Sequence, residues 1–321
     1  MPVSPALATY IGRRIAGTLG ALAGVSFIVF LLLHLVPGDV VTAILGHSAT
    51  PQGIVEMRHS LGLDRPWYLQ YFEWLDRTLH GDFGFSIALS RPVSSELGQK
   101  MLNTWVLATA SSVVAVSLGT LVGLVAALRP ASMWDRLLRN TTVALASMPV
   151  FWLGLVLVYL FSIRLSLFPA LGMRSVTGDT GLSDLLKHLV LPAITTATFS
   201  IAIIGRTVRA VVLDILSKPF ITAARALGFS ERRIVWRHVA INALPSVVSM
   251  FGLQVGYLFS GVLLTEVVFA WPGIGQLLFS SISARDVPVI QAVTLLVAVQ
   301  FTTVNLLADI VRVVVDPRSR A

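Results

Sequence analysis

The sequence predicts an all-α polytopic membrane protein with six transmembrane helices. Only 12% of its 321 residues are charged, and the mean hydropathy is +0.81. A soluble domain carries roughly 25% charged residues, so this chain lacks the polar groups to face water throughout. Helices of about 20 apolar residues span a bilayer core. Uncharged stretches that meet or approach that length are 15–33, 101–128, 140–163, 189–205, 239–265 and 287–308.

The first apolar stretch has two interpretations. It follows Arg13 and Arg14, as the apolar part of a cleaved signal peptide does. Its 19 residues exceed the usual 7 to 15 of such a segment, and the sequence after it lacks a small-residue cleavage site. We therefore expect a retained membrane helix.

The basic residues predict the orientation of the chain. Six spans place both termini on one side, and that side carries 15 of the 24 Lys and Arg residues and a net charge of +10. The opposite side has a net charge of −2. By the positive-inside rule both termini are cytoplasmic, and contact with anionic lipid explains the basic composition without nucleic acid.

The spans divide the chain into three parts. Residues 1–36 hold the cytoplasmic N-terminus and first helix, 37–100 form an external subdomain, and 101–321 form a five-helix core. The external part contains a helical stretch from Pro51 and an amphipathic helix over 67–79. It is either a packed cap or a docking surface for a partner.

The cytoplasmic link before the fifth span has its own helices. Pro219 suits a first helical turn, Gly228 ends that helix, and Ser230 with Glu231 begins a second one. A segment over 218–238 with too little apolar surface for its own core is expected to dock on another protein. The alternative is a helix resting on the lipid surface through its arginines.

This cytoplasmic helix is predicted to carry a notch. Ala224 and Gly228 stand at i and i+4, so their shared face is bare enough for another backbone to approach. Ile221 and Leu227 border this notch with apolar bulk, and Arg225 is among the arginines around it.

Catalytic motifs are missing from the sequence. It has no phosphate-binding Gly-x-x-x-x-Gly-Lys-Ser/Thr loop, no His-Glu-x-x-His motif and no Gly-x-Ser-x-Gly elbow. It also has no cysteine, which excludes thiolate metal sites and Cys nucleophiles. We therefore expect no catalytic residue, no metal site and no cofactor bound by this chain.

Few ionisable residues lie inside the spans, which argues against an ion-coupled transporter. Asp309 stands near the inner end of the sixth span, where Arg206, Arg209 or Arg312 is its expected partner. Gln254 and Gln300 are expected to join helices rather than bind substrate.

Ordered motifs along nearly the whole chain resemble one family, the permease subunits of binding-protein-dependent ABC importers, in the B-type class for dipeptides and oligopeptides. The coupling-loop motif of that family resembles Thr222-Ala223-Ala224-Arg225-Ala226-Leu227-Gly228, followed by Asn242-Ala243-Leu244-Pro245. This chain departs from the generic family motif in two ways. The generic motif has an acidic residue where this chain has Thr222, so no salt bridge is assigned to position 222. The spacing from Gly228 to Pro245 is also longer here than in the generic motif. The other motifs are Pro37-Gly38-Asp39, Leu61-Gly62-Leu63-Asp64-Arg65-Pro66, Gly81-Asp82-Phe83-Gly84, Trp271-Pro272-Gly273-Ile274-Gly275, Arg285-Asp286-Val287-Pro288 and Asp316-Pro317-Arg318.

The resemblance implies the architecture of a type I ABC importer permease in the inner membrane and a coupling helix seated on an ATP-hydrolysing subunit. The implied coupling residues are Phe220, Ile221, Thr222, Ala223, Ala224, Arg225, Ala226, Leu227 and Gly228. The candidate residues of an external or gating loop are Glu266, Trp271, Pro272, Gly273, Gly275 and Asp286.

The implied partners are a second, homologous permease subunit, two ATPase subunits or domains that bind ATP and Mg²⁺, and an external substrate-binding protein. The substrate class is di- or oligopeptides, and similar permeases import nickel, haem or other small molecules. Outside this class, an ATPase-independent channel or scaffold would share the six spans but has no need of a notched cytoplasmic helix.

Overall fold

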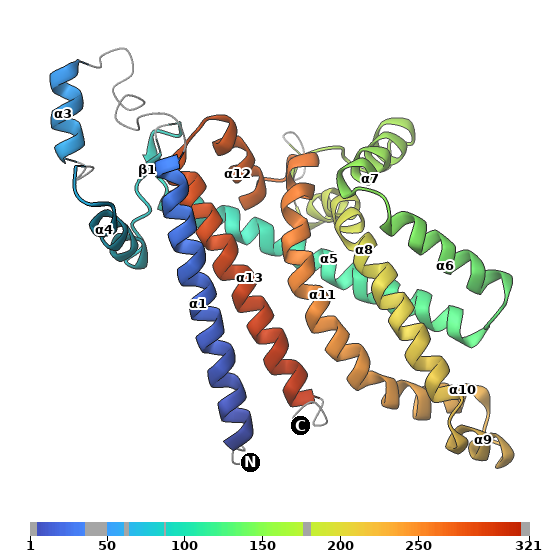
Figure 1. Ribbon diagram of the computed structural model, residues 1–321. Coiled ribbons are helices and arrows are strands. Elements are labelled where there is room, and N and C mark those ends of the chain that lie inside the picture. Colours follow the sequence, from blue (N-terminus) through green and yellow to red (C-terminus); the bar gives the residue numbers. More distant parts are fainter. Residues whose placement is uncertain (1–4, 36–49, 61–63, 87, 176–180, 316–321) are drawn as a thin grey trace. The chain divides into compact units, whose positions relative to one another are not determined.

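The computed structural model describes residues 5–35, 50–60, 64–86, 88–175 and 181–315. The motifs at 37–39, 61–63 and 316–318 lie outside these residues. The described chain is almost entirely helical (Figure 1). Its one sheet in these residues is a hairpin, in which β1 (Phe85–Ser86) pairs antiparallel with β2 (Arg91–Pro92).

The long helices coincide with the apolar stretches. They are α1 (Pro5–Leu35), α5 (Ser94–Leu128), α8 (Leu182–Leu216), α11 (Ala240–Val268) and α13 (Val287–Val315). Helices α1, α5 and α13 contain spans that are long and apolar enough to cross a membrane, and two bent helix pairs meet the same criterion when each pair is taken as one span. The structure is thus that of an all-α polytopic membrane protein. Helix α8, which contains the fourth predicted span, does not meet the criterion, so among the described residues up to five of the six predicted spans do.

The third apolar stretch is bent rather than straight. Helix α6 (Met133–Ala146) ends before Pro149, and α7 (Val150–Leu157) continues at an angle of 109° to it before passing into the π-helical segment η2 (Val158–Arg164). Pro149 lacks an amide hydrogen and disfavours helical backbone at Met148, so the helix cannot continue through this point.

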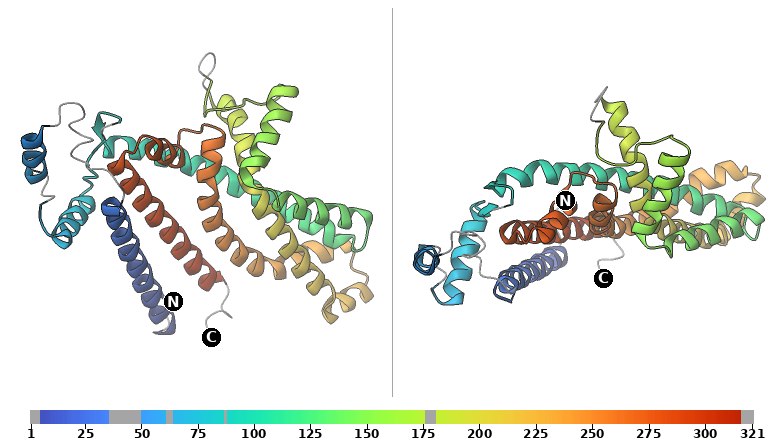
Figure 2. Two further views of the ribbon diagram at one scale, coloured as in Figure 1. Left: turned by 45° about the horizontal axis from the view of Figure 1, so that its top comes forward. Right: turned by 90° about the horizontal axis from the view of Figure 1, so that it is seen from above.

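The chain forms two compact units. The first contains residues 1–14, 101–276 and 303–321, and the second contains residues 15–100 and 277–302. In the first unit α8 packs along α11, and α6 lies beside α8 in both views of Figure 2. Its core includes Ile204, Val208, Ile221 and Leu258, all almost fully buried.

The second unit contains helices α3 (Pro51–Ser60) and α4 (Trp67–Leu79), both of which start at the predicted residues. Helix α4 packs on the outer part of α1 through aromatic rings: Tyr71 contacts Phe27 and Phe30 at centroid distances of 5.6 and 5.4 Å. The Tyr71 hydroxyl is 2.9 Å from Ser26 Oγ. The apolar stripe of α4 is only partly covered, because Phe72 and Leu79 are exposed.

Candidate functional site

The first candidate site is the turn of helices between α8 and α11. Helix α9 (Pro219–Ala226) begins at the predicted proline, and α10 (Glu231–Ile234) begins after Ser230, whose Oγ accepts a hydrogen bond from the Arg233 amide. Helix α10 continues without a break through η3 (Val235–Val239) into α11. Figure 1 shows α9 and α10 together at one end of α8.

Gly228 ends α9 in a left-handed conformation, with φ of +79°. The Phe229 amide donates to Ala224 O at 3.1 Å and the Gly228 amide donates to Arg225 O at 2.9 Å. These two bonds form a Schellman motif, which requires a positive φ that glycine adopts without strain. Phe229 packs against the core, so this glycine fixes the angle between α9 and the following chain.

The burial of α9 corrects the predicted notch. Ile221 is completely buried and Ala224 is 5% exposed, and both belong to the core cluster of the first unit. Ala224 therefore packs within this chain and offers no bare face to a partner with Gly228. Ala224 is buried together with Ile221 because the two residues are three positions apart and lie on the same face of the helix, which packs on the core. The exposed residues of the predicted coupling set are Phe220, Thr222, Ala223, Arg225, Ala226, Leu227 and Gly228.

Charged side chains join α9 to α10. Arg225 donates to Glu231 through Nε and Nη2 at 2.7 and 3.2 Å. This bond lowers the pKa of the Glu231 carboxyl, because it stabilises the ionised form. The Arg233 guanidinium lies over the Phe229 ring at 4.7 Å, and His238 stacks on the same ring. The surface around α9 is therefore basic and locally ordered.

The second candidate site is the loop between α11 and α12 (Ile274–Ser283). Glu266 is fully buried near the end of α11. Its Oε1 accepts from Thr104 Oγ1 at 2.6 Å, and its Oε2 accepts from the Gly275 amide at 2.6 Å. The Gly275 amide is in the first turn of α12, where a carboxylate also interacts favourably with the helix dipole. Glu266 thus ties the start of α12 to α5.

A second set of bonds holds the same loop on α5. The buried Trp271 donates through Nε1 to Asn103 O at 2.9 Å, and Asn103 Nδ2 donates to Pro272 O at 2.8 Å. A Cβ on Gly273 would lie 2.1 Å from Glu266 Oε1, so only glycine fits beside that carboxylate. The loop residues Glu266, Trp271, Pro272 and Gly273 are therefore brought together in a rigid, buried arrangement.

Asp286, the last predicted loop residue, belongs to the second unit and forms hydrogen bonds within that unit. Its Oδ2 accepts a hydrogen bond from Ser86 Oγ and another from the Ala88 amide at 3.2 Å. The carboxylate thus attaches the β-hairpin to the start of α13.

Sequence reasoning missed three residues that shape these sites. Asn103 and Thr104 hold the loop, and their only signal was being polar at the start of an otherwise apolar stretch. The third is Asp135, which is buried and accepts two hydrogen bonds from Arg209, of 2.8 and 2.9 Å.

The structure pairs Asp309 with a residue outside the predicted set, of which the Arg312 side chain lies outside the described residues. Asp309 pairs with Arg14 at 3.1 Å. Arg209 is already bound to Asp135, and Arg14 reaches Asp309 from the N-terminal helix, which is distant in the sequence. The expectation for Gln254 is confirmed, because its Oε1 accepts from Ser200 on α8 at 2.9 Å. Among the described residues, no group of three His, Cys, Asp or Glu side chains has metal-binding geometry.

These features define a helical membrane protein with an exposed turn of helices before α11 and a buried loop, fixed to α5, after it. The chain belongs to the family of binding-protein-dependent transport system inner membrane components, whose profile matches residues 119–321. The profile for the N-terminal part of these membrane components matches residues 7–98. The protein is therefore a multi-pass permease subunit of the inner membrane.

Relatives align along almost the full chain. The glutathione transport system permease protein GsiC of Escherichia coli K12 is 37% identical over 311 residues, covering 97% of this chain and 98% of its own. The di/tripeptide transport system permease protein DppB of Pseudomonas aeruginosa UCBPP-PA14 is 38% identical with the same coverage of both chains.

A solved structure shares the fold. A chain of the MetNI methionine ABC transporter, in an inward-facing conformation, superposes with a TM-score of 0.55 at 18% identity, covering 69% of this chain and 96% of its own. The all-α type I importer permease architecture is thereby shown.

Proposed function

We propose that this chain forms one half of the channel of an ATP-driven importer of di- and oligopeptides. Its relatives are named for glutathione and for di- and tripeptides, all short peptides. The proposed assembly pairs this chain with a homologous permease, two ATPase subunits that bind ATP and Mg²⁺, and an external binding protein. Both termini face the cytoplasm.

Helix α9 is buried on one face and exposed on the other, and this is the observation that supports its coupling to an ATPase subunit. One face, with Ile221 and Ala224, is fixed in the core, while Leu227 on the other is 74% exposed. A large exposed leucine beside the small, exposed Ala223 and Ala226 offers an apolar contact for a partner. A partner that moves this face moves α8 and α11, because α9 is joined to both through buried contacts.

In this mechanism the ATPase subunits supply the energy and α9 transmits it. ATP binding would bring two ATPase subunits together and displace α9 with them. Helices α8 and α11 would tilt as α9 moves, which opens the path toward the binding protein. The rigid bonds of Glu266 and Trp271 would make the loop before α12 follow α5 and α11 as one body.

The test is Leu227→Asp in the full chain expressed with its partner subunits. The side chain is exposed, so the variant should insert and fold, yet lose co-purification of the ATPase and lose peptide uptake. The matched control is Leu79→Asp, since Leu79 is 77% exposed at the end of α4 and should keep the ATPase bound. Unchanged ATPase recovery and uptake in Leu227→Asp would refute the coupling role.

A further inference from the structure

A cavity of about 270 Å³ lies between α5, α6 and α8 in the first unit. Its walls are mainly apolar: Val122 and Ala126 come from α5, Val143 from α6, and Phe199 and Ile203 from α8. Gly123 and Gly205 let α5 and α8 approach closely here, since a Cβ on Gly123 would lie 2.5 Å from Gly205 O. The apolar hollow is therefore built by a tight helix crossing.

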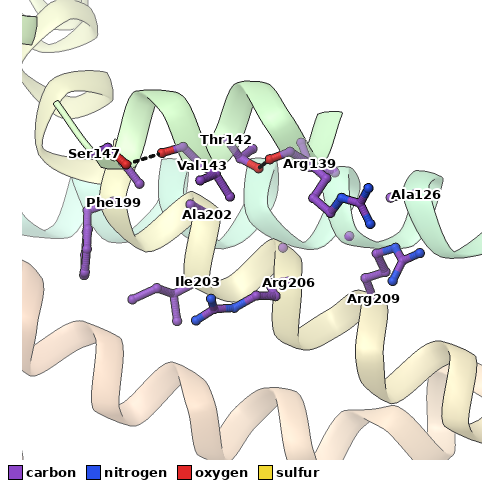
Figure 3. A pocket seen from close by; sticks show the side chains of 14 residues that line it. Ala126, Arg139, Thr142, Val143, Ser147, Phe199, Ala202, Ile203, Arg206 and Arg209 are labelled. Carbon is purple, nitrogen blue, oxygen red and sulfur yellow. Dashed lines mark hydrogen bonds between the residues drawn. The ribbon is translucent and has the colours of Figure 1, made fainter. Parts of the chain in front are cut away.

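Arginines border this hollow at two places, because Arg139 and Arg209 lie on one side of it and Arg206 points away from them, toward Ile203 (Figure 3). Figure 3 shows Arg139 extending from α6 and Arg206 and Arg209 from α8. Arg209 is neutralised by Asp135. Asp135 also interacts electrostatically with Arg139, although within the described chain neither Arg139 nor Arg206 forms an ion pair with a carboxylate. The cavity thus combines an apolar interior with an excess positive charge at its mouth.

The surface of α6 next to the cavity indicates what surrounds it. Met133, Trp134 and Leu137 are all at least half exposed on this short helix, which also carries Arg136 and Arg139. Exposed tryptophan together with arginine is typical of a helix at the boundary between headgroups and acyl chains. These residue types suit contact with lipid, and an arginine in such a position snorkels toward phosphate.

We propose that this cavity binds an anionic phospholipid. The phosphodiester headgroup binds at the edge of the cavity, where the Arg139 and Arg206 side chains turn toward it, and a segment of one acyl chain occupies the space lined by Val143, Phe199 and Ile203. The volume is at the lower end of ligand pockets, so it holds part of a chain while the rest of the lipid stays in the bilayer. The charge at the mouth selects a net-negative headgroup over a zwitterionic one.

Binding to α6 and α8 together gives the lipid a structural consequence. The headgroup bridges a short helix that precedes the Pro149 bend to a long helix that leads into α9. A bound anionic lipid therefore stabilises the packing of α6 on α8, which Asp135 and Arg209 already join.

The test is native mass spectrometry of the full chain, purified with its partner subunits in mild detergent and titrated with dioleoylphosphatidylglycerol. We expect one lipid retained per chain, with affinity about fivefold weaker in Arg206→Gln and about thirtyfold weaker in the double variant with Arg139→Gln, as expected for roughly equal contributions from two interfacial arginines. Arg136→Gln, on the same helix but outside the cavity lining, is the matched control and should bind like the unmodified chain.

A second variant tests the acyl-chain site independently of charge. Ala202→Phe narrows the cavity, and we expect it to weaken phosphatidylglycerol binding at least fivefold with all three arginines present. Ala144→Phe, on the exposed side of α6, should have no effect. If either Arg206→Gln or Ala202→Phe prevents recovery of the chain, the remaining variant still tests whether the cavity binds the lipid.

Several results would overturn the proposal. Equal affinity for dioleoylphosphatidylcholine, or unchanged binding in both Arg206→Gln and Ala202→Phe, would exclude a selective lipid site. Displacement of the lipid by millimolar inorganic phosphate would reduce the site to a general anion site. A photocrosslinker at Ala202 that joins the partner permease rather than lipid would show that the cavity is a protein interface.

Discussion

At the scale of single residues, backbone conformation and close approach decide what is allowed. Gly228 and Gly273 illustrate two different reasons for glycine. Gly228 has a positive φ and nothing within 4 Å of a built Cβ, whereas a Cβ on Gly273 would overlap the Glu266 carboxylate. The same substitution at the two positions should therefore have different costs.

Gly228→Ala should destabilise the protein by about 1 kcal/mol, because alanine pays for the left-handed backbone and meets no steric obstacle. Thermal unfolding of the purified chain measures this loss. Gly228→Asn is the control, since asparagine tolerates this conformation better and should recover part of the stability. Equal stability of the alanine variant and the unmodified chain would contradict the Schellman geometry.

Gly273→Ala should cost more, about 1–3 kcal/mol, because the new methyl group displaces a buried carboxylate that is held by Thr104 and Gly275. The measurement is again thermal unfolding. Combining it with Glu266→Asp, which shortens the acid by one methylene, should cost less than the sum of the two single changes. Strict additivity would show that the two residues do not collide.

At the scale of elements, buried polar contacts set how helices pack. Helix α6 is bent away from α7 at Pro149 and joined to α8 by Asp135 and Arg209, whose side chains are 3% and 25% exposed. Its apolar content alone does not hold it there, since much of its surface is exposed. The ion pair is thus a specific, largely buried link between α6 and α8.

Asp135→Asn should destabilise the protein by about 1–3 kcal/mol, because it leaves a largely buried guanidinium without its carboxylate. The change is measured by thermal unfolding and by proteolysis of the 129–149 region. Asp214→Asn serves for comparison: Asp214 pairs with Lys218 at 3.1 Å on the exposed surface, where such pairs contribute little. Similar losses in both variants would refute the role of the buried pair.

At the scale of the whole molecule, the absence of cysteine makes the proposed orientation directly testable. Leu79→Cys and Leu227→Cys place single thiols at two highly exposed positions. A membrane-impermeant maleimide should label the first in right-side-out vesicles and the second only in inverted vesicles, as the charge bias predicts. Labelling of both from the same side would overturn the orientation of the termini.

The sequence alone determined the class of this protein, the positions of its long helices, and the start and end of α9 at Pro219 and Gly228. These features depend on composition and on local rules for helix caps, which a contiguous stretch of residues carries by itself. The resemblance to importer permeases rested on ordered motifs of the same local kind.

Only the tertiary structure decided which face of α9 is buried, that Asp309 binds Arg14, and that Asn103 and Thr104 hold a loop about 170 residues away in the sequence. These contacts join segments far apart in the chain, so no local pattern specifies them. The predicted notch failed for the same reason. Burial of Ile221 and Ala224 depends on helices α8 and α11 meeting beneath α9, which the sequence of α9 does not encode.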